Sequence, residues 1–210
     1  MAGGKFNRSG HDVDLIDQYF SKQAKNYGNN DYNIFWPIIR RIESSAILKM
    51  TGDLENKVCL DIGCGNGFYS NLMIMNGAKL VTCVDRNKSM LDQIVHPSMT
   101  KILGDAETFL TSRQHDIALF AGVLEFLDTP ITAIKNVTLH CKKESRLIAL
   151  VPSVGVLTSL YSLFHQTHGF EIKRFSESSL TKMLNDSGWC IENIEYSLPF
   201  SLVVSAVRYV

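Results

Sequence analysis

Three glycines at alternate positions stand between an apolar run and a stretch with helical character. The run is VCLDI (58–62), and the glycines are Gly63, Gly65 and Gly67. Glycine lets the backbone turn sharply, so that backbone N–H groups and the positive end of the following helix can face a ligand. The segment therefore predicts a ligand-binding crevice at the carboxyl end of a strand. The alternative is a tight turn without a ligand.

The spacing of these glycines argues against a dinucleotide site. The dinucleotide pattern G-x-G-x-x-G needs a glycine at position 68, where the sequence has Phe68. Asp61 stands two residues before the first glycine and could point a carboxylate into the crevice, where it would repel a pyrophosphate. We expect a cationic or zwitterionic ligand group here.

Two further acids follow the next apolar runs. Asp85 comes 18 residues after Gly67, where a carboxylate can accept hydrogen bonds from both ribose hydroxyls. Asp105 follows the run at 100–103 and can accept from the exocyclic amine of a base. Each alone could be a turn-forming aspartate at a strand end. Together with the glycine turn, they offer partners to an amino-acid end, a ribose and an adenine.

Short apolar runs alternating with helical stretches must position these side chains. The runs are VCLDI (58–62), LVTCV (80–84), TKIL (100–103), DIALF (116–120), LIALV (147–151) and LVVSAV (202–207). Near-continuous apolar strands between helices are typical of a parallel sheet that is covered on both faces.

Amphipathic helices are predicted at both ends of this pattern. Apolar residues recur at spacings of three and four over 12–27 and again over 35–50. The apolar face of the second helix is Phe35, Ile38, Ile39, Ile42, Ala46 and Met50. The last helix is predicted to begin after Ser176 as N-cap and to stop at Gly188, with Leu180, Met183 and Leu184 on one face.

The composition excludes some classes of protein. The 210 residues include 21 Lys+Arg and 21 Asp+Glu, and this zero net charge disfavours a nucleic-acid partner, because such binding depends on neutralising phosphates. The five cysteines form no C-x-x-C pair and are predicted to be small core residues in a reducing compartment. The polar start lacks a secretory signal, and the uncharged stretch 147–170 contains proline, glycines and polar residues. We expect a cytoplasmic protein without stable membrane insertion.

At these motifs the sequence resembles the class I S-adenosylmethionine-dependent methyltransferases. The resemblance covers Lys57 to about Val151 and rests on DIGCGNG (61–67), VTCVD (81–85), GDAE (104–107) and AGVLEFL (121–127). The last segment resembles the V-L-E-H segment of small-molecule members, with Phe126 where many relatives carry histidine. The closest likeness is to enzymes of quinone, tetrapyrrole and secondary-metabolite methylation.

The resemblance implies a Rossmann-like α/β fold. Its sheet would have seven mostly parallel strands with the last strand antiparallel, helices on both faces and an N-terminal helical cap. The single domain 1–210 would comprise that cap (1–56), a cofactor-binding core (57–151), a substrate lid (152–175) and a C-terminal helix with strands (176–210).

The resemblance also implies a cofactor, S-adenosyl-L-methionine (SAM), and its product S-adenosyl-L-homocysteine (SAH). Asp61 and the glycine turn would hold the methionine moiety, Asp85 the ribose, and Asp105 with Ala106 the adenine. The implied cofactor-binding residues are Tyr19, Tyr27, Asp61, Gly63, Gly65, Gly67, Asp85, Arg86, Met90, Asp105, Ala106 and Gly122.

Methyl transfer from a sulfonium is an in-line displacement, so holding acceptor and methyl in contact supplies most of the acceleration. A hydroxyl acceptor also needs a general base. Candidates are Glu125, His165 and His168. Alternatively, Glu125 caps a turn and the histidines lie on the solvent side of a loop. The H-x-x-H pattern offers two metal ligands without a third, and we predict no metal.

The segment 154–170 is apolar and stands where this fold often inserts its substrate-binding element. Tyr161 and Phe164 are candidates to line an apolar or aromatic acceptor. The same residues could instead pack against the N-terminal helices, or contact a partner or a membrane surface.

The sequence therefore favours a small-molecule methyltransferase, acting on oxygen more than on nitrogen or carbon. The segment AGVLEFL contains no Asn/Asp-Pro-Pro-Tyr/Phe motif, which disfavours methylation of adenine or glutamine amino groups. Alternatives are a cofactor-binding regulatory or assembly protein without turnover, a protein methyltransferase and, last, an NAD-dependent oxidoreductase. The oligomeric state and the identity of the acceptor stay open.

Overall fold

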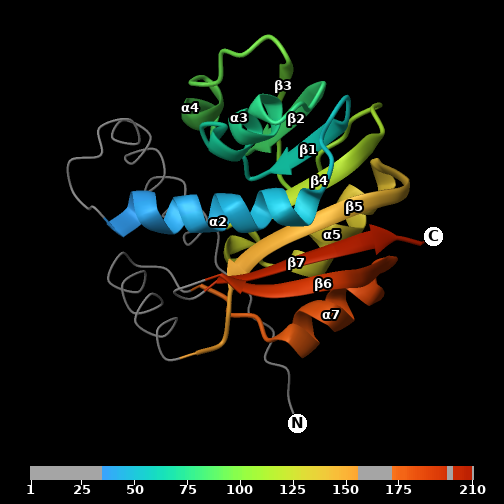
Figure 1. The fold of residues 1–210 in the computed structure, drawn as a ribbon. Helices are drawn as coiled ribbons and strands as arrows, with labels where there is room; N and C mark the ends of the chain where they lie inside the picture. Colours follow the sequence, from blue (N-terminus) through green and yellow to red (C-terminus); the bar gives the residue numbers. More distant parts are fainter. Residues whose placement is uncertain (1–34, 156–171, 198–200, 210) are drawn as a thin grey trace.

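A computed structural model of the chain describes residues 35–155, 172–197 and 201–209. Seven strands form one sheet in the order β3-β2-β1-β4-β5-β7-β6 (Figure 1). The strands are β1 (Val58–Ile62), β2 (Leu80–Asp85), β3 (Met99–Leu103), β4 (His115–Ala121), β5 (Cys141–Pro152), β6 (Trp189–Ser197) and β7 (Ser201–Arg208). The helix predicted over 12–27 lies outside the described residues.

The strand directions confirm the mostly parallel sheet. Strand β1 pairs in parallel with β2 and β4, β2 with β3, and β4 with β5. Strand β7 is antiparallel to both of its neighbours, β5 and β6. The carboxyl ends of β1, β2, β3 and β4 therefore meet at one edge of the sheet, where ligands bind in open sheets of this kind.

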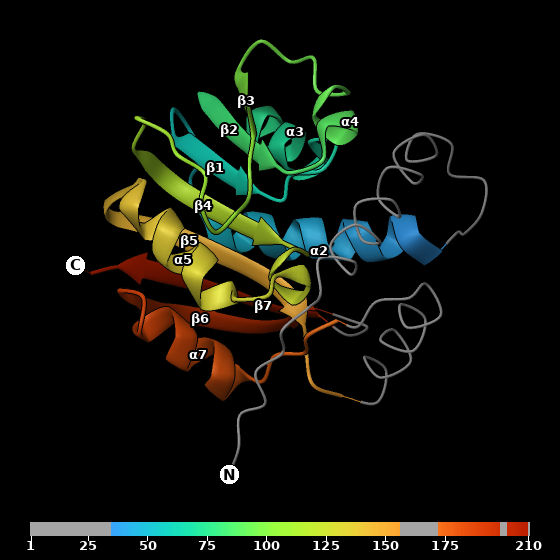
Figure 2. The ribbon, with the colours of Figure 1, turned by 180° about the vertical axis from the view of Figure 1, so that it is seen from behind.

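Helices cover both faces of the sheet. On one face lie α2 (Phe35–Thr51), α3 (Phe68–Met75) and the short α4 (Lys88–Leu91), and on the other α5 (Pro130–Leu139) and α7 (Glu177–Asn185) (Figures 1 and 2). A 3-10 turn, η1 (Leu124–Phe126), follows β4. Within the described ranges, none of the helices combines the length and apolar character that a membrane crossing requires.

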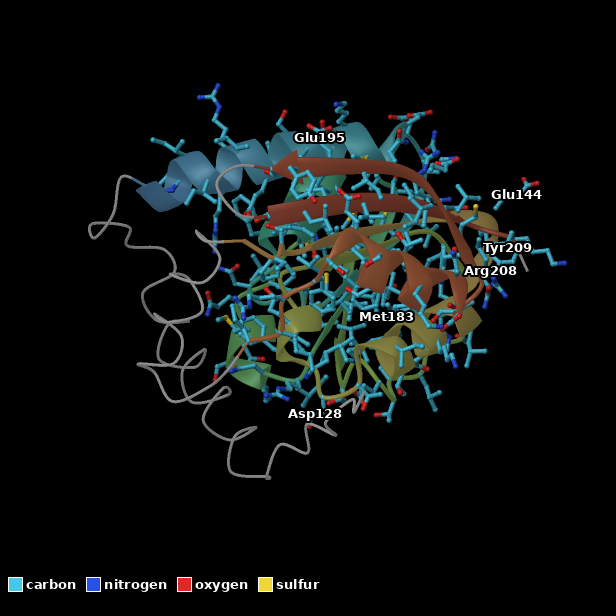
Figure 3. The ribbon with its side chains drawn as sticks, turned by 90° about the horizontal axis from the view of Figure 1, so that it is seen from below. Asp128, Glu144, Met183, Glu195, Arg208 and Tyr209 are labelled. Carbon is cyan, nitrogen blue, oxygen red and sulfur yellow. The ribbon has the colours of Figure 1, made fainter. Side chains whose placement is uncertain are left out.

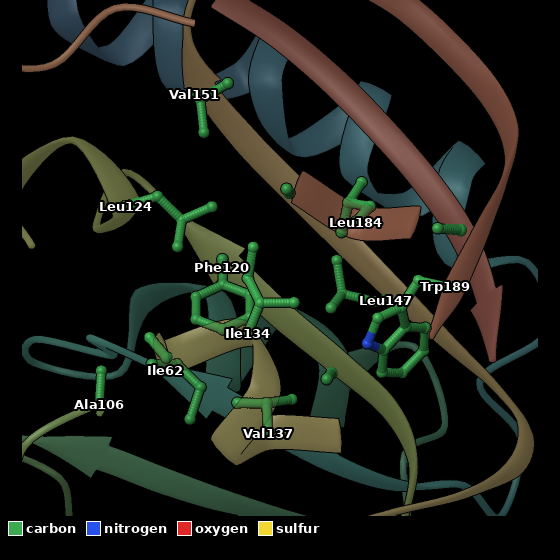
Figure 4. Packing of buried hydrophobic residues seen from close by; sticks show 14 of the residues in the cluster. Ile62, Ala106, Phe120, Leu124, Ile134, Val137, Leu147, Val151, Leu184 and Trp189 are labelled. Carbon is green, nitrogen blue, oxygen red and sulfur yellow. The ribbon is translucent and has the colours of Figure 1, made fainter. Parts of the chain in front are cut away.

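Two hydrophobic clusters, one on each face, hold these layers together. Alternate residues of the central strands enter opposite clusters, as in β4, where Phe120 packs toward α5 and Leu119 toward α2 and α3. Figure 4 shows Phe120 among Ile62, Ile134 and Leu147 in the first cluster. The Ser176 hydroxyl accepts the Ser179 N–H at 3.1 Å, which confirms the predicted start of α7.

Three sequence-based predictions need correction. Helix α2 forms as predicted, with Ile39, Ala46 and Met50 buried, but Ile38 and Ile42 are 53% and 41% exposed, and Ile47, which was not predicted, is buried. Strand β6 was absent from the predicted runs because it lies at the sheet edge and carries exposed polar residues. Cys190, on this strand, is exposed rather than a core residue.

A buried histidine joins two strands and a helix end. His115 has no exposed surface; its Nδ1 lies 2.7 Å from the carbonyl of His140 and its Nε2 lies 2.9 Å from Thr82 Oγ1. Because a carbonyl only accepts, Nδ1 carries the proton and Nε2 accepts from the Thr82 hydroxyl. Burial lowers the pKa of His115, so the neutral ring belongs to the folded state.

We expect this histidine to make the fold acid-sensitive. As the pH falls below the ordinary value of 6.5, the unfolded chain binds a proton at His115 that the folded chain refuses, so the free energy of unfolding decreases. The variant His115→Gln loses hydrogen-bond stability at every pH but lacks this titration. Urea unfolding between neutral and mildly acid pH should show the stability of the two proteins converging. A constant difference would refute the assignment.

Candidate functional site

The turn after β1 is fastened to β2 by backbone hydrogen bonds. The N–H groups of Gly63 and Cys64 donate to the Val84 carbonyl at 2.8 and 3.1 Å. Gly63 and Gly65 have φ values of 65° and 55°, which L side chains rarely adopt. The chain can therefore reverse direction at the sheet edge and start α3 a few residues later.

The Asp85 carboxylate closes this turn from the end of β2. Its Oδ2 accepts the Gly65 N–H at 2.7 Å, and its Oδ1 accepts the Asn87 N–H at 2.8 Å. A carboxylate oxygen can accept more than one hydrogen bond, so this carboxylate can also serve as an acceptor for a hydroxyl donor. Asp85 thus both shapes the turn and presents acceptors to the space beside it.

The next two loops bring an apolar and an acidic group to the same edge. The Asn87 side chain accepts the Met90 N–H at 3.2 Å, which starts α4 and buries Met90 to 3% exposure. After β3, Asp105 accepts the Glu107 N–H at 2.7 Å and is itself exposed. The Gly104 N–H donates to the Asp85 carbonyl at 3.0 Å, which joins the two loops.

These loops enclose an open cleft with an empty volume of about 1020 Å³. Of the predicted cofactor residues, the structure brings into its lining Gly63, Gly65, Asp85, Arg86, Met90, Asp105, Ala106 and Gly122. Gly67 is the N-cap of α3 and is not among the lining residues. Tyr19, Tyr27, Tyr161, Phe164, His165 and His168 lie outside the described residues.

Asp61 does not point into the cleft, contrary to expectation. It is 1% exposed, is not part of the lining and accepts a hydrogen bond from the Ser70 hydroxyl at 2.6 Å. Burial raises the pKa of Asp61 to about 7, although the Ser70 hydrogen bond opposes the rise. Its contact with Ser70 ties β1 to α3 behind the glycine turn.

Three lining residues from α2 and α3 were not anticipated. The Arg40 guanidinium lies 4.8 Å from the centre of the Phe68 ring, and that ring meets Tyr69 edge-on at 5.0 Å. The sequence places Arg40 on a predicted helix, but periodicity does not tell which polar residue of a helix faces a cleft. Phe126 and Leu127 add apolar surface on the opposite side of the turn.

Glu125 lies just behind the cleft wall. It is 3% exposed, and its Oε1 is 3.7 Å from the position that a Cβ on Gly122, a lining residue, would take. Its Oε2 is buried without a hydrogen-bond partner in the described part of the chain. Burial, aided by the charge of Glu43, raises the pKa of Glu125 to about 8.

The residues present fit a nucleoside that carries an amino-acid end. A Cβ built at Gly65 would meet no atom within 4 Å, so the backbone there is open to a ligand. Asp85 offers acceptors for a ribose, and Met90 and Ala106 offer apolar contact beside Asp105 for a base. The fold and this cleft define an α/β nucleoside-binding protein of the Rossmann-like class.

Sequence comparison identifies the family within this class. Residues 60–149 match the family model described as "Methyltransferase domain". No curated protein sequence matches the chain significantly. The family match over part of the chain, together with the solved structures below, indicates a SAM-dependent methyltransferase.

Solved structures share the fold at low sequence identity. Magnesium protoporphyrin IX methyltransferase from Synechocystis PCC 6803 with bound SAH is 21% identical, with a TM-score of 0.73 over 94% of this chain and 100% of that one. The N-methyltransferase NodS from Bradyrhizobium japonicum WM9, in complex with SAH, is 14% identical, with a TM-score of 0.72 over 92% and 98%. The 1,6-didemethyltoxoflavin-N1-methyltransferase from Burkholderia thailandensis is 15% identical, with a TM-score of 0.68 over 100% and 94%.

A matched pair of substitutions separates folding from binding in the glycine turn. Gly65→Ala places a methyl group in open space, so we expect only the left-handed backbone strain of ~1–2 kcal/mol in unfolding free energy. The methyl group should weaken SAM binding at least ~10-fold because it occupies ligand space. Calorimetric binding and urea unfolding measure the two effects.

Gly63→Ala is the control because its Cβ would lie 2.5 Å from Val123 Cγ2. We expect a further loss of ~1–3 kcal/mol from overpacking, partly restored in the double variant with Val123→Ala. The assignment of Gly65 to the cofactor site fails if Gly65→Ala binds SAM as tightly as the unsubstituted protein.

Proposed function

We propose that this methyltransferase acts on a hydroxyl group of a small apolar or aromatic molecule. SAM supplies an activated methyl group, and the glycine turn, Asp85 and Asp105 hold it at the carboxyl ends of the strands. The described cleft wall nearest η1 is apolar, with Val123, Phe126 and Leu127, which suits an acceptor with little charge.

The proposal that the acceptor is methylated on oxygen rests on one observation, the unpartnered Oε2 of Glu125. A hydroxyl must lose its proton on methylation, and a general base works best when its pKa is near the working pH. Glu125, with a pKa of about 8, fits this requirement beside the cleft wall at Gly122. His165 and His168, as well as the contacts of Tyr19, Tyr27, Tyr161 and Phe164, remain predictions.

The names of the structural neighbours support part of this proposal. A porphyrin methyltransferase is consistent with a planar, largely apolar acceptor. Two N-methyltransferases make amine methylation the second candidate. All five cysteines are unpaired, which suits a reaction of small-molecule biosynthesis in the reducing cytoplasm.

Matched phenol and aniline acceptors test the choice of atom. With SAM and each pair of acceptors, we expect methoxy products from the phenols, identified by mass and by the NMR shift of the new methyl group. Glu125→Gln should lower kcat roughly 100- to 10,000-fold, the usual contribution of a general base. Glu195→Gln is the control and should leave kcat unchanged, because the half-buried Glu195 lies on β6 and pairs with Lys49 (Figure 3).

Methylation of the anilines alone would replace oxygen by nitrogen as the target atom. SAM binding without transfer to any acceptor, protein substrates included, would favour a cofactor-binding regulatory or assembly protein. Transfer to a protein side chain alone would identify a protein methyltransferase.

A further inference from the structure

Two carboxyl groups from different elements lie close to the cleft. Glu43 of α2 accepts the Ser201 hydroxyl at 2.7 Å through Oε1 and the Tyr69 hydroxyl at 3.4 Å through Oε2. Tyr69 lines the cleft. Glu125 of η1 is near enough to Glu43 for the two charges to repel. Glu43 reaches the cleft through Tyr69, and Glu125 lies next to Gly122, so both carboxyl groups are behind the cleft lining.

The two carboxyl groups differ in how they are satisfied. Burial raises the pKa of Glu43, but both of its oxygens accept hydrogen bonds, and these bonds and the charge of Arg40 oppose the rise. Glu125 is buried, and its Oε2 has no partner among the described residues. An ionised carboxylate in that position would be costly, because Oε2 lacks both water and a donor and the backbone hydrogen bond to the group offsets only part of the effect of burial.

Few cations face Glu125 from the described elements around it. Arg40 lies over the Phe68 ring, and its charge acts on Glu43. The backbone N–H of Lys173 donates to the Glu125 carbonyl at 3.1 Å, while its ammonium donates to the Leu127 carbonyl. A positive charge entering the cleft would therefore act on an acid group that the protein itself leaves largely uncompensated.

SAM and its product SAH differ in charge. SAM carries a sulfonium cation, whereas SAH, the product, is a neutral thioether. We propose that Glu125 is protonated when the cleft is empty or holds SAH, and releases its proton to solvent when the sulfonium of SAM enters. This inference rests on the proposed binding of SAM in this cleft and adds that the cofactor's charge activates the base.

The proton balance of the proposed reaction closes with this step. One proton leaves Glu125 for solvent when SAM binds. During methyl transfer, the ionised carboxylate accepts the proton of the acceptor hydroxyl as the C–O bond forms and the C–S bond breaks. Glu125 is then protonated again beside neutral SAH. The cycle yields methylated acceptor, SAH and one proton, and the base is reset without a further step.

Because SAM binding is coupled to proton release from Glu125, the affinity for SAM depends on pH. The direction of this dependence follows from mass action. Rising pH favours the ionised form of Glu125, so SAM affinity increases as the pH rises toward about 8. The increase is at most ~10-fold per pH unit for one proton. SAH affinity should show no such rise. The α-amino group common to both ligands titrates in the same range, and SAH therefore serves as its control.

Isothermal titration calorimetry in phosphate and in Tris tests the proposal without an acceptor. The two buffers differ in ionisation enthalpy, so the difference in heat counts the protons exchanged on binding. We expect SAM to release a fraction of one proton near neutral pH beyond the value for SAH. Glu125→Gln should abolish the excess, and Glu195→Gln, on β6 and paired with Lys49, should keep it.

Glu43→Gln serves as the second variant if Glu125→Gln fails to fold. Removing the negative neighbour should let Glu125 ionise at lower pH, which moves the excess proton release to lower pH. Equal proton release for SAM and SAH, or an excess that survives in Glu125→Gln, would overturn the inference while leaving SAM binding intact. Absence of SAM binding would instead remove the proposed function.

Discussion

The hydrogen bond from the Gly65 N–H to the Asp85 carboxylate is the contact on which the site depends. It joins the turn after β1 to the end of β2 at 2.7 Å, while the second Asp85 oxygen holds the Asn87 N–H that leads into α4. A hydrogen bond to a charged acceptor is stronger than one between neutral groups, and the Asp85 carboxylate accepts two such bonds from backbone donors. One side chain therefore positions the glycine turn, the α4 loop and its own acceptors toward the cleft.

Three acidic residues near this edge have different surroundings and therefore different uses. Asp85 is paired with backbone donors and lines the cleft. Asp61, with its pKa raised to about 7, is enclosed and bonded to Ser70, which makes it a structural link between strand and helix. Glu125 is enclosed without a partner for Oε2, which leaves that oxygen for a ligand or a proton. Burial and hydrogen bonding, rather than residue type, separate these roles.

Much of the architecture could be predicted because the buried strands are short, apolar and separated by helices. VCLDI and the runs after it coincide with or lie within observed strands, and Ser176 caps its helix as expected. The edge strand β6 escaped prediction because its side chains are largely exposed, so no apolar run marks it. On α2, Ile38 and Ile42 fit the helical period but lie on the exposed side, since contacts with β5, β6 and β7 decide which face is buried.

The site was predictable to the extent that backbone chemistry determines it. Glycines with positive φ and acids after parallel strands must lie at one sheet edge, so Gly65, Asp85 and Asp105 could be placed together from spacing alone. The direction of the Asp61 side chain could not be predicted in this way. Alternation along β1 and the position of Ser70 on α3 turn it inward. Arg40 and Glu43 reach the cleft region only through the packing of α2, which a single sequence does not specify.

The central claim is that this cleft binds SAM through Asp85 and the glycine turn. Calorimetric titration of the protein and of Asp85→Asn with SAM, SAH and NAD tests it most directly. We predict binding of both sulfur ligands, no binding of NAD and a loss of roughly 10- to 100-fold in affinity in the variant, as expected for hydrogen bonds to a charged group. Binding of NAD, or unchanged SAM affinity in Asp85→Asn, would contradict the account.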